Sequence, residues 1–178
     1  MSKLLSNLVS FDGKEGFFNK QINNLSKQIK ENGLKEKVQL LTCSDNSITV
    51  GARGNKLLKA ATGAWVMFLK ETDVLSDWAL KNIVELLEKE NPDMVSVMGM
   101  LRKDGTAPKM FVNSLKNQAV VDAGILMMPP CQRNPMRATL AKKCQFDEVN
   151  VEEDVNYIAQ LLKTGIKTEA SIDKAYLM

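Results

Sequence analysis

The sequence contains no histidine. This absence excludes Ser–His and Cys–His nucleophilic catalysis, histidine general bases and zinc sites with histidine ligands. Any catalysis by this chain must therefore use carboxylates, lysines, arginines or a metal ion held by oxygen ligands.

Long hydrophobic runs are also absent. No run approaches the roughly 20 apolar residues that span a bilayer, and residues 1–11 lack the pattern of a signal peptide. The three cysteines, Cys43, Cys131 and Cys144, are odd in number and widely spaced, which favours reduced thiols over a disulfide framework. We therefore expect a cytoplasmic protein without a membrane span.

The sequence has little excess charge of either sign. Its 24 basic and 21 acidic residues are interleaved and leave a net charge of +3. Basic stretches typical of nucleic-acid-binding proteins are missing. We expect no nucleic-acid partner.

The order of apolar segments predicts one α/β domain over residues 1–178. In the first hundred residues, strands alternate with amphipathic helices in the order β-α-β-α-β-α-β, which is typical of a mixed, mainly parallel sheet flanked by helices. The expected strands are 4–11, 38–42, 65–69 and 94–100, and the expected helices are about 18–29, 55–62 and 77–90, the last capped by Ser76. The pattern then changes to strands 109–114 and 120–127, helices 134–143 and 152–163, and a last strand 166–172.

The stretch 51–73 carries the clearest functional signals. We expect a basic turn bracketed by glycines, Gly51-Ala52-Arg53-Gly54, ahead of the helix. The loop 45–55 could then cradle a phosphate with backbone N–H groups and the Arg53 charge. Its spacing matches neither the phosphate-loop nor the dinucleotide-binding pattern. An ordinary strand-to-helix turn with a solvated arginine explains it as well.

Two acidic clusters are further candidates. Glu71 and Asp73 directly follow a buried strand, at the sheet edge where open α/β folds bind ligands, and their oxygens suit a divalent cation. They equally suit the dipole of the helix that follows. Glu152, Glu153 and Asp154 open another helix, where a carboxylate could act as a general base or could simply stabilise the helix end.

Taken together, these motifs resemble family 2 glycosyltransferases of the GT-A fold. The resemblance rests on the run G-x-[KR]-x-N-K-L-L-x-x-A-x-G, followed by an aromatic residue, an apolar strand and an acidic run. Asp45-Asn46 upstream, and Asn91-Pro92-Asp93, Asn134-Pro135 and Glu153-Asp154 downstream, occur in the order that the family shows. The run itself is formed by Gly51, Arg53, Asn55, Lys56, Leu57, Leu58, Ala61 and Gly63.

The resemblance implies a sugar transfer from a nucleotide-diphospho-sugar to an acceptor hydroxyl, with Mg²⁺ or Mn²⁺ as cofactor. It implies a nucleotide-binding half, residues 1–100, and an acceptor-side half, residues 101–178. The implied roles are nucleotide binding by Asp45, Asn46, Arg53 and Asn55, metal binding by Glu71 and Asp73, and general base catalysis by Asp154 beside Glu153.

The DxD region departs from the family pattern. Lys70 and Thr72 stand where aspartates are expected, and a lysine at that place opposes cation binding. Two hypotheses follow: an active glycosyltransferase with an altered metal site, or a glycosyltransferase fold that has lost catalysis and serves as a structural or binding subunit. Met127 and Met128 could belong to an interface with a protein partner or a second copy, or could fill the core.

Overall fold

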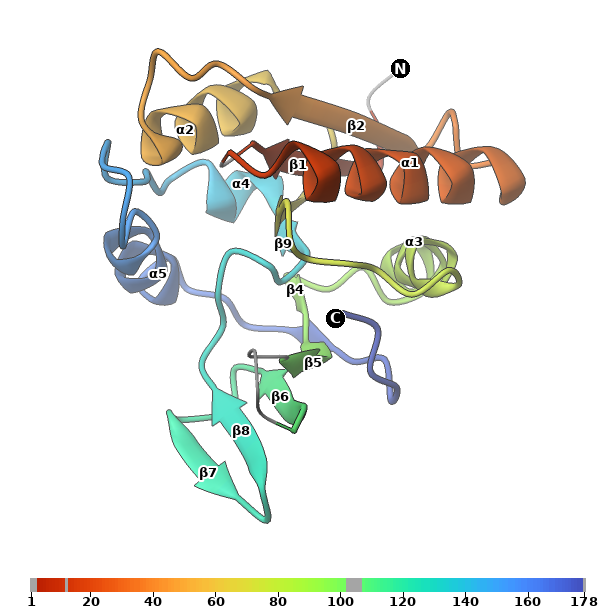
Figure 1. Cartoon of the computed structure of the whole chain (residues 1–178). Coiled ribbons are helices and arrows are strands. Elements are labelled where there is room, and N and C mark those ends of the chain that lie inside the picture. Colours follow the sequence, from red (N-terminus) through yellow and green to blue (C-terminus); the bar gives the residue numbers. More distant parts are fainter. Residues whose placement is uncertain (1–2, 12, 102–106, 178) are drawn as a thin grey trace.

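A six-stranded sheet forms the centre of the molecule (Figure 1). The structure is a computed structural model that describes residues 3–11, 13–101 and 107–177. Strand β1 (Leu5–Ser10) lies between β2 (Val38–Cys43) and β3 (Trp65–Lys70) and is parallel to both. Strand β9 (Met136–Arg137) runs antiparallel between β3 and β4 (Met94–Val95), and β10 (Glu169–Ala170) pairs in parallel with β4. The expected α/β fold with a mixed, mainly parallel sheet is confirmed.

Helices cover both faces of this sheet, because strand side chains alternate between the two faces. Trp65, Met67 and Leu69 of β3 belong to one apolar cluster, and Val66 and Phe68 belong to the other. The first cluster is closed by α1 (Glu15–Glu31) and α3 (Ala79–Glu90). The second is closed by α2 (Val50–Ala60), α4 (Ala138–Ala141) and α5 (Val155–Leu162). The three cysteines are buried free thiols.

A second, four-stranded sheet lies beside the first, in the order β5-β6-β8-β7. Its strands are β5 (Val97–Leu101), β6 (Lys109–Asn113), β7 (Val120–Asp122) and β8 (Ile125–Met128). Figure 1 shows the β7–β8 hairpin projecting away from the six-stranded sheet. The single strand expected over 94–100 is therefore two strands in different sheets, and the one expected over 120–127 is a hairpin. It turns at Ala123 and Gly124, whose φ angles are 45° and 81°.

The basic turn expected at 51–54 is wrong, because these residues lie inside α2. The helix begins at Val50, and the Thr49 side chain caps it by accepting a hydrogen bond from the Ala52 N–H at 3.2 Å. The two glycines of the run have a packing role instead. A Cβ at Gly51 would lie 1.7 Å from the carbonyl oxygen of Asp147, and one at Gly54 would lie 2.9 Å from the Phe146 ring. They let segment 146–149 approach the helix closely.

Two helix predictions also need correction. The helix expected over 134–143 is only the short α4, because Asn134 is not a cap. Its amide instead accepts from the Cys131 N–H and donates to the Val95 and Asn113 carbonyls. Helix α3 begins at Ala79, and Ser76 contributes only its carbonyl oxygen.

The face of α5 that packs inward also differs from the expected one. The helical spacing of Val155, Ile158, Ala159 and Leu162 predicts that these four residues face inward. Tyr157 and Leu161 are the buried residues, while Val155 and Leu162 are 59% and 48% exposed.

None of the helices in the described part of the chain is long and apolar enough to cross a membrane.

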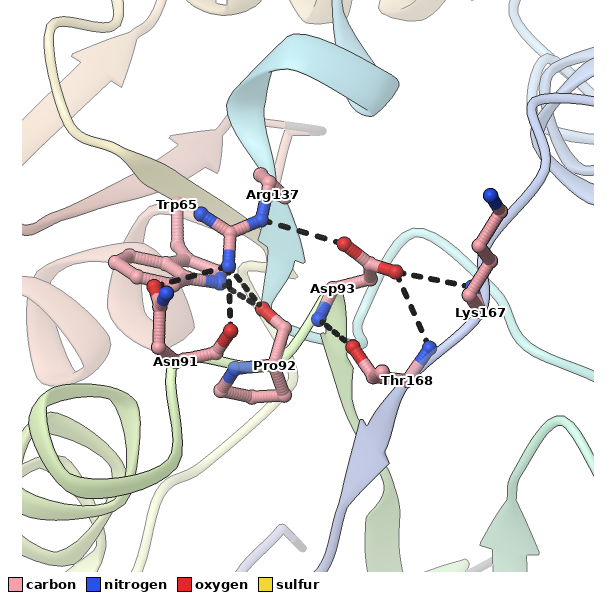
Figure 2. A network of polar contacts seen from close by, with 7 residues as sticks. All are labelled: Trp65, Asn91, Pro92, Asp93, Arg137, Lys167 and Thr168. Carbon is pink, nitrogen blue, oxygen red and sulfur yellow. Dashed lines mark hydrogen bonds and ion pairs between the residues drawn. The ribbon is translucent and has the colours of Figure 1, made fainter.

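A polar network holds α3, β3, β9 and β10 together (Figure 2). The Arg137 guanidinium stacks over the Trp65 ring at 4.5 Å and donates to the carbonyls of Asn91 and Pro92 at 2.6 and 3.0 Å. It also pairs with Asp93, with 3.4 Å between Nε and Oδ1. The other oxygen of Asp93 accepts from the N–H groups of residues 167 and 168 at 3.0 and 3.1 Å. This network fixes the short strand β9 inside the sheet and β10 at its edge.

Replacing Asp93 with alanine is expected to destabilise the protein by about 2 kcal/mol at pH 7, since it leaves two backbone N–H groups without their acceptor and removes the ion-pair partner of Arg137. Burial opposes ionisation of Asp93, but these hydrogen bonds and Arg137 outweigh it and lower its pKa below 3.8. A group whose pKa is lower in the folded state stabilises the protein above the unfolded pKa and loses this effect as the pH falls below it. Urea unfolding of the wild type and Asp93→Ala should therefore show a smaller difference at pH 3 than at pH 7. A difference that is equal at both pH values would contradict this role, and the exposed Asp122→Ala serves as control.

Candidate functional site

Two adjoining cavities lie where the carboxyl ends of β1 and β3 meet the start of α5. The larger measures about 100 Å³ and the smaller about 20 Å³. Both are lined by Ser10 from the end of β1, Val50 from the start of α2, Lys70 from the end of β3, and Glu153. We call this place the edge pocket; the residues that line only one of its two cavities are Lys14, Gly54, Phe68, Leu69, Glu71, Thr72, Gln132, Arg133 and Phe146. It occupies the edge of the sheet at which open α/β folds bind ligands.

Lys70 lines both cavities of the edge pocket. Its ammonium lies 3.1 Å from Glu153 Oε1 and 3.9 Å from Asp154 Oδ2. The Lys70 side chain is 41% exposed, whereas the Glu153 side chain is 9% exposed. The sequence places Lys70 and the 153–154 pair more than 80 residues apart, but the fold brings them into direct contact.

Gln132 connects the carboxylate pair to the smaller cavity. Its side-chain N–H donates to Asp154 Oδ2, which orients that carboxylate. Its carbonyl oxygen is buried and has no hydrogen-bond donor among the described residues. An unsatisfied buried acceptor is costly, so this oxygen is suited to accept from a hydroxyl group of a ligand.

The carboxylates of Glu71 and Asp73 are both buried and both engaged. Asp73 Oδ2 accepts from the backbone N–H of Lys70 at 2.8 Å and from Arg133 Nε at 2.9 Å. Burial alone would lower the pKa of Arg133, but the Asp73 charge raises it, so the guanidinium stays cationic. Glu71 Oε1 accepts from the backbone N–H of Lys14 at 2.9 Å.

These residues do not fit the expected Mg²⁺ or Mn²⁺. Mg²⁺ in such sites is held by one or two carboxylates together with substrate phosphates and water, so these carboxylates must be available to coordinate it. Here Asp73 is neutralised by Arg133, and the ammonium of Lys70 occupies the neighbouring place. In the described part of the chain, no group of three or more Cys, Asp or Glu side chains is arranged to hold a metal ion.

The four residues expected to bind a nucleotide do not line either cavity. Arg53 is 5% exposed and donates from Nη1 to the carbonyls of Asp45 and Ile48, each at 3.0 Å. Asn55 both donates to and accepts from the backbone of Phe146, at 3.0 and 2.9 Å. In the structure, Arg53 and Asn55 hold the 45–48 loop and the 146 segment against α2.

The other two candidates are nearer the surface. The Asp45 carboxylate accepts from the hydroxyl and N–H of Ser47 at 2.5 and 3.1 Å, and these bonds lower its pKa below the usual range. Lys56 approaches the same carboxylate at 3.5 Å. Asn46 is exposed. None of the four lines the edge pocket, and their role toward a nucleotide stays a prediction.

Sequence reasoning missed Ser10, Lys14, Gln132 and Arg133. Gln132 and Arg133 stand in an irregular segment ahead of Asn134, which gives no periodic signal. Charge could have suggested the pairing of Lys70 with Glu153, since a lysine and a cluster of carboxylates attract each other when the fold brings them together.

No family model and no curated protein sequence matches the chain. The structure of S. aureus TarS 1–349 in complex with UDP-GlcNAc is similar to it, with a TM-score of 0.66 and 17% identity, over 98% of this chain and 57% of that one. TarS 1–349 in complex with UDP has a TM-score of 0.66 and 18% identity, over 98% of this chain and 59% of that one. The longer S. aureus TarS chain has a TM-score of 0.68 and 19% identity, over 98% of this chain and 36% of that one. The chain thus spans a little over half of TarS 1–349, and it has the GT-A fold that the glycosyltransferase TarS shows.

Proposed function

We propose that this chain is a glycosyltransferase that binds a nucleotide-diphospho-sugar in the edge pocket and transfers the sugar to an acceptor hydroxyl. The observation that carries the proposal is that Lys70 and Gln132, which line the pocket at the carboxyl edge of the sheet, both contact the carboxylate of Asp154 beside it. Support comes from the shared fold, since the TarS structures hold UDP-GlcNAc and UDP. Residues 1–100 then form the nucleotide-binding half and residues 101–178 the acceptor-side half.

The proposed reaction is a direct displacement. Asp154 takes the proton of the acceptor hydroxyl, and the acceptor oxygen forms a bond to the anomeric carbon of the sugar. The bond between that carbon and the diphosphate oxygen breaks, and the nucleoside diphosphate leaves with the bonding electrons. Gln132 orients Asp154 through its hydrogen bond. No step runs through a divalent ion, because the residues present do not fit one.

Asp154 is a better candidate for the base than its neighbour. Its side chain is 21% exposed, so an acceptor can reach it, whereas the Glu153 side chain is 9% exposed. Glu153 lies closer to Lys70, at 3.1 Å. We assign Glu153 the role of positioning Lys70.

The second candidate function is a glycosyltransferase fold without catalysis that acts as a structural or binding subunit. The contact of Lys70 with both acidic residues favours this second candidate, because the carboxylate that would accept a proton from the acceptor is engaged in an ion pair. The exposed apolar side chains of the hairpin, Val120, Val121 and Met128, are 54%, 63% and 42% exposed and suit a protein partner or a second copy.

Calorimetric titration with UDP-GlcNAc and a GDP-sugar, combined with an assay of nucleotide release, separates these functions. We expect a dissociation constant below about 1 mM for one of the donors, which corresponds to roughly 4 kcal/mol of binding free energy, and release of UDP or GDP above the rate without protein. Binding without release would support the second candidate. No binding of either donor at millimolar concentration would contradict the proposal.

A further inference from the structure

Three cationic side chains line the edge pocket, Lys14, Lys70 and Arg133, and among these three Lys70 lines both cavities. Arg133 is held by Asp73 at 2.9 Å. Lys70 is different, because it lines both cavities and its side chain is 41% exposed. Ion pairs with an exposed partner are weak, since water and salt screen them. The ammonium of Lys70 can therefore exchange its partner at little cost.

A diphosphate is a stronger partner for this ammonium than the carboxylates are. It carries more negative charge than a single carboxylate, and lysine binds phosphate oxygens as a compact charge with three donors. The described residues around the pocket also include no group of three or more Cys, Asp or Glu side chains arranged to hold a metal ion. The positive charge that a bound diphosphate requires must then come from protein side chains.

We propose that Lys70 takes the place of a divalent metal ion at the donor diphosphate, and that its movement to the diphosphate releases Glu153 and Asp154. This inference rests on the proposed function and deepens it. Two consequences follow. Donor binding does not depend on a divalent ion. The donor also binds before the acceptor, because Asp154 becomes available as a base only when Lys70 has left it.

The test is calorimetric titration of UDP and GDP into the full chain, in EDTA and in Mn²⁺. The wild type should bind one of the two nucleotides with dissociation constants in EDTA and in Mn²⁺ that agree within about threefold. Lys70→Met should weaken this binding at least tenfold, about 1.4 kcal/mol, while Lys70→Arg should stay within about fivefold of the wild type because it keeps the charge. Lys81→Met removes an exposed lysine on α3 and serves as the matched control. The corresponding nucleoside, uridine or guanosine, has no diphosphate, so its binding should be unaffected by Lys70→Met.

The outcomes distinguish this inference from the proposed function. Binding that appears only with Mn²⁺ would overturn the role of Lys70 and leave the proposed function standing. Equal binding of the nucleotide by the wild type and by a folded Lys70→Met, checked by circular dichroism, would overturn it as well. No binding of either nucleotide in any condition would contradict the proposed function and this inference together.

Discussion

Replacing Gly51 with alanine is expected to destabilise the protein by roughly 3 kcal/mol, the upper end for overpacking of a core. The added Cβ would lie 1.7 Å from the carbonyl oxygen of Asp147 and 2.7 Å from its carbon. These are backbone atoms, so no rotation of a side chain relieves the clash. The hydrogen bond from the Gly51 N–H to the Val149 carbonyl, now 3.1 Å, should also be lost. Segment 146–149 would have to move away from α2.

Gly16→Ala is the matched control for this experiment. Gly16 also lies in a helix, α1, but a Cβ there meets no atom within 4 Å. Alanine should therefore stabilise the protein by up to about 1 kcal/mol, because glycine is the poorer helix former. Thermal unfolding should place the melting temperature of Gly51→Ala roughly 6–12 °C below the wild type and that of Gly16→Ala at or above it. Equal melting temperatures for the two variants would contradict the packing role of Gly51.

Asp154→Asn is expected to reduce sugar transfer by a factor of about 100 to 10,000, the range for loss of a general base. Asparagine keeps the size of the side chain and can still accept the hydrogen bond from Gln132, but it does not take a proton. Binding of UDP or GDP should change less than about threefold, since the base acts on the acceptor. Nucleotide release measured with donor and acceptor present, together with calorimetry, checks both parts.

Glu153→Gln is the companion variant to Asp154→Asn. It removes the closer partner of Lys70 but leaves Asp154 in place, so we expect transfer to fall much less than in Asp154→Asn. If Asp154→Asn retained the rate of the wild type while Glu153→Gln abolished transfer, the assignment of the base would have to move to Glu153.

The sequence predicted the order of strands and helices in the first hundred residues because their apolar patterns are regular, although it placed a turn at 51–54 and a single strand over 94–100. Leu80, Ile83, Val84 and Leu87 of α3 recur at helical spacing, and all four are buried. The second half was predicted less well. Its strands are short, and β9 is made of two residues held by the contacts of Arg137 rather than by their own pattern.

The glycines of α2 show why local signals misled the prediction. Gly51 and Gly54 resembled a turn around Arg53 when only neighbouring residues were considered. Glycine is required at these positions because Phe146 and Asp147, about 95 residues further along the chain, approach the helix closely. Long-range packing of this kind overrides local propensity and leaves no trace in the spacing.

The candidate site was predicted in part for the same reason. The two acidic clusters were identified, but their partners were not, since Lys70–Glu153 and Asp73–Arg133 are contacts between distant segments. The expectation of a metal at Glu71 and Asp73 was made from the acidic residues alone, without these partners. Arg133 neutralises Asp73, and no pattern of acidic residues alone could have indicated it.

The most direct test of the central claim is to map where a nucleotide binds. Titrating ¹⁵N-labelled protein with UDP or GDP and following the amide signals should show the largest shifts at Ser10, Lys70, Glu71 and Glu153, around the edge pocket. The indole N–H of Trp65, which donates to the Pro92 carbonyl at 2.8 Å within the Arg137 network, should not move. Saturable shifts confined to the β7–β8 hairpin or to the Trp65 network, with none at the edge pocket, would contradict the account.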